Sequence, residues 1–443
     1  MTELLSTISV MLTPYLGFQR WYIAYSGGLD SHVLLHLTWR LRQEALRVGK
    51  SFPELRAVHV NHQLQADSSD WAAQCSSTCN EYDIAIDVRA VTIEGRGQGV
   101  ESLARAARYQ VFEEVVDEHS VLLLGHHQDD QAETFLLRLM RGAGAAGLAA
   151  MPVSRALGRG TLFRPLLNMA RSQLEAYAAE RRLECIDDPS NRDPQYRRNF
   201  IRHRVMPVLA EVWPAYRYSI TSAAELQAET SRLLNAYLSA DVANISDADG
   251  TLDIRVLINF DRPRQRAVLR HYVFQHLGVR LDRAQSEELV GQFLHSSRDS
   301  QPMFELNNEM TLRAFRGRLI CERGPPQYVF DRGLVQDWDG QQACLISGLG
   351  RLSVEAGGEF VPRGKITVRF RSGGERCRIA GHAHSRPLKK LLQEWSVPPW
   401  KRDALPLIYC DDEIAAIADI AICEGFQAAV GEPGLSLRWL LSR

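Results

Sequence analysis

The chain contains 443 residues, of which 45% are hydrophobic and 24% charged, and its formal net charge is −1. This length predicts two or three domains, and this composition excludes a disordered or fibrous protein. No stretch approaches the roughly 18 apolar residues that a membrane-spanning helix requires, and the N-terminus lacks the basic region of a secretory signal. We therefore expect a cytoplasmic protein with no membrane contact. The eight cysteines include no CxxC pair, which predicts reduced thiols rather than disulfides.

The first half of the chain alternates short apolar runs with amphipathic stretches. Runs rich in branched and aromatic residues predict strands at 21–25, 55–60, 84–91 and 121–127. Amphipathic stretches predict helices at 31–47, 68–82 and 101–118. Such alternation is typical of a doubly wound parallel sheet with helices on both faces, so we expect an α/β domain over residues 1–214.

A glycine-rich loop, Ser26-Gly27-Gly28-Leu29-Asp30-Ser31, follows the first predicted strand. The carboxyl end of that strand is where such sheets bind ligands, and glycines let a phosphate approach the backbone at the start of the next helix. A plain turn is the alternative. The loop has no lysine and is not a Walker P-loop. The Gly49-Lys50-Ser51 stretch is not one either, because the earlier glycine of that motif is replaced by Glu44.

Asp30 would repel a phosphate unless a cation lay between them. We therefore predict that Asp30 is a Mg²⁺ ligand that bridges to a polyphosphate.

A second polar motif, GHHQDDQAET, lies at the end of the fourth predicted strand. It supplies His126, His127, Asp129, Asp130, Glu133 and Thr134. Asp130 and Glu133 are three residues apart on one helical face, so both carboxylates can point at one cation or ammonium group. Acidic residues also cap helix N-termini, and adjacent histidines are a possible zinc site, although no third ligand has suitable spacing.

Two arginine-rich segments are candidates for a clamp on a phosphate or an RNA backbone. Arg105 and Arg108 share a helical face with Glu101, and Arg198 and Arg202 lie near the end of the α/β domain. Arginine binds phosphate through two parallel hydrogen bonds, and a salt-paired exposed helix is the alternative for the first segment.

The second half divides by composition. Residues 215–330 read mainly as amphipathic helices, with a possible hairpin at 304–323, residues 331–355 as a linker, and residues 356–443 as a basic α+β domain. Between residues 360 and 403 the only acidic residues are Glu375, Glu394 and Asp403. Clustered cations beside tryptophans suit an RNA-binding surface, and a solvated basic face is the alternative. The RNA-binding candidates are Arg369, Arg371, Arg376, Lys389, Lys390, Trp400, Lys401 and Arg402.

These motifs carry a resemblance to a known family. SGGLDS resembles the SGGxDS loop of the PP-loop ATP pyrophosphatases, which have an adenine nucleotide α-hydrolase-like fold. HHQDDQAET, ESLARAARY, the stretch from DPSNRD to YRRNFIR, and the basic C-terminus resemble the tRNA(Ile)-lysidine synthetase family.

The resemblance implies ATP and Mg²⁺ as cofactors, without zinc or an iron–sulfur cluster. It implies tRNA(Ile) with a CAU anticodon and free L-lysine as partners, and it leaves a homodimer open. Ser26 to Ser31 would hold pyrophosphate, and the catalytic candidates are Asp30, His127, Asp130 and Glu133. The alternatives are a PP-loop tRNA thiolase, which the missing CxxC disfavours, and a catalytically degenerate tRNA-binding protein.

Overall fold

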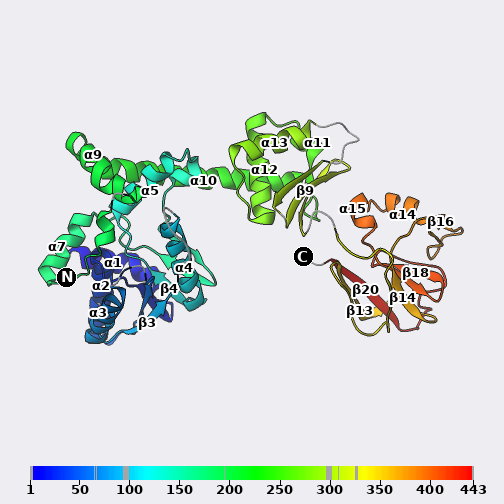
Figure 1. Cartoon of the computed structure of the whole chain (residues 1–443), viewed down its shortest axis with the longest axis horizontal. Helices are drawn as coiled ribbons and strands as arrows, with labels where there is room; N and C mark the ends of the chain where they lie inside the picture. Colours follow the sequence, from blue (N-terminus) through cyan, green and yellow to red (C-terminus); the bar gives the residue numbers. More distant parts are fainter. Residues whose placement is uncertain are drawn as a thin grey trace. The chain divides into compact units, whose positions relative to one another are not determined.

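The computed structural model describes residues 3–63, 65, 67–92, 99–193, 195–295, 302–307, 309–324 and 328–441. The chain folds as two compact units, Met1–Leu234 and Asn235–Arg443. In Figure 1 the first unit runs from blue to green and the second from green to red. Among the described residues, no helix has the length and apolar character needed to cross a membrane.

The first unit is built on a six-stranded sheet in the order β3-β2-β1-β4-β6-β5. The strands are β1 (Arg20–Ala24), β2 (Glu54–Asn61), β3 (Ala85–Ala90), β4 (Ser120–Leu123), β5 (Ser154–Leu157) and β6 (Gly160–Phe163). All pairings are parallel except that of β5 with β6. The mostly parallel α/β fold predicted from the sequence is confirmed, and the antiparallel edge hairpin was not predicted.

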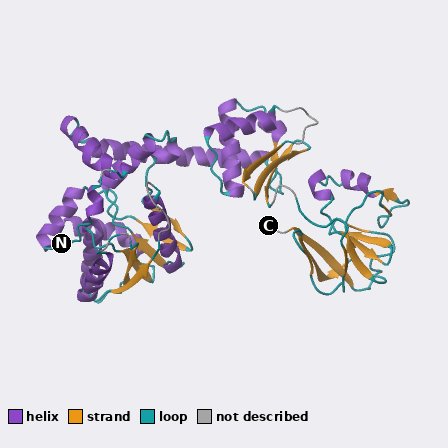
Figure 2. Ribbon diagram, in the orientation of Figure 1, coloured by secondary structure: helices purple, strands orange, loops and turns teal. Residues whose placement is uncertain are grey.

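Helices cover both faces of this sheet, as Figure 2 shows in purple around the orange strands. They are α1 (Glu3–Leu12), α2 (Leu29–Arg47), α3 (Ser68–Glu81), α4 (Val100–Val115), α5 (Gln128–Leu139) and α7 (Arg171–Arg181). Trp21 and Ile23 of β1 pack in the core that contains α1, α2, α3 and α7, whereas Tyr22 packs with α4. Alternate side chains of this buried strand therefore pack into two different cores, one on each face of the sheet.

A chain of short elements leads out of the sheet. It comprises α6 (Ala145–Leu148), a 3₁₀ turn (Pro189–Arg192), α8 (Arg197–Phe200), a π-helical turn (Ile201–Val205), α9 (Met206–Val212) and the long α10 (Tyr216–Ile245). The π turn contains Arg202 and follows the short helix that carries Arg198, and such turns are frequent at functional sites.

The second unit begins with a helical module that packs on a small sheet. Its helices are α11 (Ile254–Leu257), α12 (Arg262–Leu277) and α13 (Arg283–Leu294). The expected hairpin is part of a four-stranded sheet of β7 (Leu252–Asp253), β10 (Arg318–Arg323), β9 (Met310–Phe315) and β8 (Met303–Asn307). The short β7 also lies within a span that was expected to be mainly helical.

The rest of the second unit is an α+β module with its own core. Its longer strands are β13 (Gly350–Gly358), β14 (Ile366–Arg369), β17 (Leu407–Cys410), β18 (Glu413–Ile417) and β20 (Gly434–Leu441). Its shorter strands are β11 (Val335–Asp337), β12 (Cys344–Ile346), β15 (Arg376–Cys377), β16 (Arg386–Pro387) and β19 (Ala421–Ile422), and its helices are α14 (Leu388–Glu394) and α15 (Pro399–Arg402).

The linker expected over 331–355 is wrong. Strands β11 and β12 and the start of β13 occupy it, and Trp338, Ile346 and Leu352 are buried in the core of this module. The glycines and polar residues of this stretch suggested a linker, but β11 and β12 are short, and several apolar residues of the stretch are buried once the strands are paired.

Candidate active-site cleft

Two loops meet at the carboxyl ends of β1 and β4. These strands are parallel neighbours, and the strand order runs outward in opposite directions from them, which makes this the switch point where such sheets bind ligands. A cleft of about 1370 Å³ is lined by the Ser26–Ser31 loop, the residues after β4, and parts of α4 and α8. The two motifs found in the sequence therefore form one site.

Hydroxyl groups close the glycine loop on itself. Ser31 Oγ donates to the Gly28 carbonyl at 2.9 Å and lies 3.1 Å from Ser26 Oγ. The backbone N–H of Ser26 donates to Ser31 Oγ at 3.2 Å. Gly27 has φ +80°, and a Cβ there would lie 2.3 Å from Ile186 Cδ1. The glycine is therefore needed both for its backbone conformation and for close packing of the chain beside it.

Asp30 has an oxygen suited to a cation. Its Oδ1 is buried and has no hydrogen-bond partner among the described residues, while its Oδ2 lies 3.5 Å from His127 Nε2. An unpaired buried carboxylate oxygen is costly unless an ion binds it. The described residues contain no cluster of three metal-ligating side chains. A Mg²⁺ bound to substrate phosphates needs only one or two protein carboxylates, so Asp30 fits that ion.

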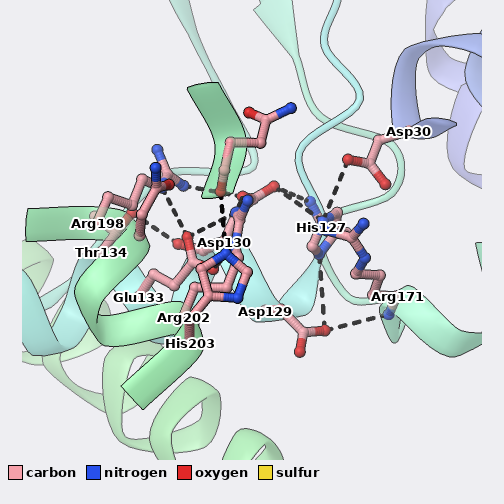
Figure 3. A network of polar contacts seen from close by, with 12 residues as sticks. Asp30, His127, Asp129, Asp130, Glu133, Thr134, Arg171, Arg198, Arg202 and His203 are labelled. Atoms are coloured by element: carbon pink, nitrogen blue, oxygen red, sulfur yellow. Dashed lines mark hydrogen bonds and ion pairs between the residues drawn. The ribbon is translucent and has the colours of Figure 1, made fainter. Parts of the chain in front are cut away.

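His127 lies at the centre of the acidic residues, as Figure 3 shows. It is fully buried, with Nε2 3.5 Å from Asp130 Oδ2 and Nδ1 3.7 Å from Asp129 Oδ2. Burial lowers the pKa of His127, but the hydrogen bond and charge of Asp30 and the charges of Asp130 and Asp129 outweigh it, so the net pKa is raised. A protonated His127 would hold these three carboxylates together.

Asp130 and Glu133 form a buried ion-pair network with two arginines (Figure 3). Arg198 Nε donates to Glu133 Oε2 at 2.7 Å and its Nη2 to Asp130 Oδ1 at 3.0 Å. Arg202 Nε donates to Glu133 Oε1 at 2.6 Å and its Nη2 to Asp130 Oδ1 at 3.3 Å. Burial raises the pKa of Asp130, but His127 and Arg198 outweigh it and hold that pKa well below its usual range. The predicted acidic pair is thus the partner of Arg198 and Arg202, two of the four arginines of the predicted clamp.

The sequence did not single out several residues of this site. Arg217 from α10 pairs with Asp129, whose Oδ2 also accepts the backbone N–H of Arg171 at 3.2 Å. A Cβ on Gly125 would lie 2.9 Å from the Asp30 carbonyl oxygen, so this glycine lets the two loops approach each other. The glycine directly before the histidine pair was a usable signal. No sequence signal indicates the contact between Arg217 and Asp129, since the two residues are 88 positions apart in the chain.

Arg105 and Arg108 line the same cleft from α4 and are exposed. The Arg105 guanidinium lies 4.9 Å from the Tyr109 ring centre, and Arg108 Nε lies 3.2 Å from His62 Nε2. The side chain of Glu101, predicted on the same face, is outside the described part of the structure. Two guanidiniums at the rim suit an anionic ligand.

Most of the predicted tRNA-binding residues of the second unit already contact other residues of the protein. Trp400 Nε1 donates to Glu322 Oε2 at 2.9 Å, and Lys401 Nζ lies 2.7 Å from Glu322 Oε1. Arg371 pairs with Asp403 at 3.3 Å. Further contacts are made by Arg369 with Asp412, by Arg376 with the Ser385 carbonyl, and by Arg402 with the Val397 carbonyl. Lys389 and Lys390 are exposed on α14.

Comparisons with known proteins cover nearly the whole chain. A family model described as a PP-loop domain matches residues 2–209, and models described as the TilS substrate binding domain and the TilS substrate C-terminal domain match 252–320 and 366–439. A tRNA(Ile)-lysidine synthase of Serratia proteamaculans is 38% identical over 98% of this chain and 98% of its own length. Synthases of the same name from Coxiella burnetii and Methylococcus capsulatus are 38% and 39% identical over 93% and 89% of this chain, and 91% and 90% of their own lengths.

Proposed function

The chain belongs to the tRNA(Ile)-lysidine synthase family, and we propose that it ligates L-lysine to C2 of the wobble cytidine of tRNA(Ile) with a CAU anticodon. ATP is the energy source. Pyrophosphate is released when the tRNA is adenylated, and AMP is released when lysine replaces it. The product base pairs with A instead of G, so the tRNA reads AUA as isoleucine. The observation that carries this proposal is the single cleft that joins the glycine loop to the acidic and arginine network. The names of the relatives do not favour the tRNA thiolase alternative.

In the first step, the carbonyl oxygen of the cytosine attacks the α-phosphorus of ATP. We assign the Ser26–Ser31 loop to the pyrophosphate that leaves, since the N–H groups at the start of α2 and the dipole of that helix favour an anion there. Bound Mg²⁺ would offset the phosphate charge, with Asp30 Oδ1 as its protein ligand. His127 orients Asp30 and Asp130 beside this loop.

In the second step, the side-chain amine of free lysine attacks C2, and AMP leaves. The sequence made Asp130 and Glu133 catalytic candidates that can point at one ammonium group, which would suit them to bind this amine in its charged form. Both carboxylates are paired with Arg198 and Arg202, and the lowered pKa of Asp130 makes that carboxylate a poor proton acceptor in this arrangement. We assign them instead to fixing the two arginines at the wall of the cleft, where guanidiniums can face the phosphates of ATP.

The cytosine must leave its stack to be reached in the cleft. We propose that Arg105 and Arg108 receive the anticodon or the ATP phosphates, while cations of the second unit bind the rest of the tRNA. A cytoplasmic location follows from this substrate, and a homodimer stays a prediction.

The function is tested by incubating the protein with labelled lysine, ATP and Mg²⁺, and transcripts that carry CAU or a mutated wobble base. We expect label only on the CAU transcript and only with ATP. Label without ATP, or none on the CAU transcript, would contradict the proposal. An Asp30→Ala control should lose AMP release while tRNA binding is retained, and loss of both would indicate misfolding.

A further inference from the structure

A buried arginine, Arg164, lies beside the cleft. Arg164 follows β6 and is only 2% exposed. Its Nη1 donates to the Pro152 carbonyl at 2.7 Å, its Nε to His126 Nδ1 at 3.2 Å, and its Nη2 reaches the Tyr109 hydroxyl at 3.5 Å. Among the described residues, no carboxylate forms an ion pair with it. Burying an unpaired cation is costly, so stability alone does not explain this residue.

The contact with His126 fixes the position of a proton. An arginine guanidinium only donates hydrogen bonds, so the Nδ1 atom that faces it must carry a lone pair. The imidazole is then neutral with its proton on Nε2. Burial lowers the pKa of His126 to about 3; the charge of Asp130 opposes this shift and that of Arg164 adds to it, so the ring stays neutral at physiological pH.

The other nitrogen of this ring is available to a ligand. His126 directly precedes the buried His127 and lines the cleft. Within the described part of the chain, its Nε2 has no hydrogen-bond partner. A neutral donor with a fixed tautomer suits an acceptor oxygen, and it would not compete with the cations around it for a negative charge.

We propose that Arg164 is a positioning residue that holds His126 as the neutral Nε2–H tautomer, and that this N–H donates to an acceptor oxygen of the bound substrate. The oxygen is either a phosphoryl oxygen of ATP or the carbonyl oxygen of the cytosine. The identity of this oxygen rests on the proposed function, whereas the assignment of the His126 tautomer does not.

The tautomer is tested first, without substrate. The full chain is labelled with ¹⁵N-histidine, and His126→Asn identifies the His126 signals. We expect the pattern of a neutral Nε2–H imidazole in the wild type and a mixture of tautomers in Arg164→Met. The matched control is Arg155→Met, because the exposed Arg155 also contacts the Tyr109 ring, at 5.1 Å, but makes no hydrogen bond to His126. An Nδ1–H tautomer, or the same pattern in Arg164→Met as in the wild type, would overturn the proposal.

Steady-state kinetics then test the role of the N–H. His126→Gln keeps an amide N–H near the Nε2 position, whereas His126→Asn moves it toward Nδ1. We expect His126→Asn and Arg164→Met each to lower kcat/KM by about 10- to 100-fold, with partial rescue by His126→Gln. The Arg164→Met/His126→Asn double variant should be no worse than either single one, because the two residues act together. A higher KM for ATP would identify the phosphoryl oxygen, and an effect on kcat or on the KM for tRNA would identify the cytosine oxygen.

The two proposals fail differently. If the wild type labels tRNA but Arg164→Met equals Arg155→Met, the positioning role is wrong and the proposed function stands. If the wild type labels no tRNA, the function is wrong while the ¹⁵N experiment still decides the tautomer. Thermal melting accompanies each variant. If Arg164→Met does not fold, the wild-type ¹⁵N pattern decides the tautomer, because an Nδ1–H signal there would overturn the proposal.

Discussion

At the scale of single residues, the site depends on charges that stabilise one another inside the protein. Asp130 is 7% exposed, and four of its polar contacts come from His127, Arg198 and Arg202. Removing one partner from such a network leaves buried charge unpaired, which typically costs about 3 to 5 kcal/mol. The network is therefore a structural requirement as well as a chemical one.

Acid stability tests this conclusion. The folded pKa of Asp130 is lower than its unfolded value, so its stabilising contribution is complete above about pH 4 and is lost as the pH falls through the folded pKa. We expect Asp130→Asn to be less stable than the wild type at neutral pH and to show a smaller loss of stability on acidification. Urea unfolding of the full chain at several pH values measures both effects.

The matched control is Glu175→Gln. Glu175 is an exposed partner of Arg171 in the same unit, and exposed pairs contribute about 0 to 1 kcal/mol. If Asp130→Asn kept the acid dependence of the wild type, the network would not carry the stability assigned to it.

At the scale of elements, the first half of the fold was largely predictable, because buried strands and amphipathic helices have distinct periods. The four strands predicted there correspond to β1 to β4, with boundaries that differ by a few residues. The edge hairpin of β5 and β6 was missed because β5, unlike the fully buried β4, is mostly exposed and has no apolar run. The partners of charged residues were also out of reach: Glu322 contacts Trp400 across 78 residues.

Alanine substitutions at the two glycines of the loop should distinguish a role in folding from a role in ligand binding. Gly27 has a positive φ and no space for a Cβ, so Gly27→Ala should destabilise the first unit by at least about 1 to 2 kcal/mol. At Gly28 the φ is −69° and a Cβ would lie 3.5 Å from its nearest neighbour. Gly28→Ala should therefore fold as well as the wild type, or better by about 0.4 to 1 kcal/mol, while its Cβ weakens ATP binding.

Thermal melting and calorimetric titration with ATP and Mg²⁺ distinguish these outcomes. A Gly27→Ala protein as stable as the wild type would show that Ile186 moves away easily. Unchanged ATP affinity in Gly28→Ala would show that the phosphates do not bind at this part of the loop.

At the scale of the whole molecule, the ATP cleft and the basic C-terminal module belong to different compact units. Substitutions in the second unit should therefore change tRNA binding without changing ATP binding. Within the second unit, the three-dimensional partners decide which cations are available. Lys401 is held by Glu322, whereas Lys389 and Lys390 project from α14 into solvent.

This difference predicts unequal effects of lysine substitutions on tRNA affinity. Lys389→Ala/Lys390→Ala should weaken tRNA binding and reduce the slope of log Kd against log salt by about 0.7 to 0.9 for each phosphate that the protein no longer neutralises. Lys401→Ala should change that slope much less, because its ammonium already has a carboxylate partner and exchanges fewer counterions. Filter binding of tRNA over a salt series measures both, with ATP affinity as the control that must stay constant. Equal slopes for the two variants would mean that tRNA displaces Glu322 from Lys401, and that the charge pairs of this module open when RNA binds.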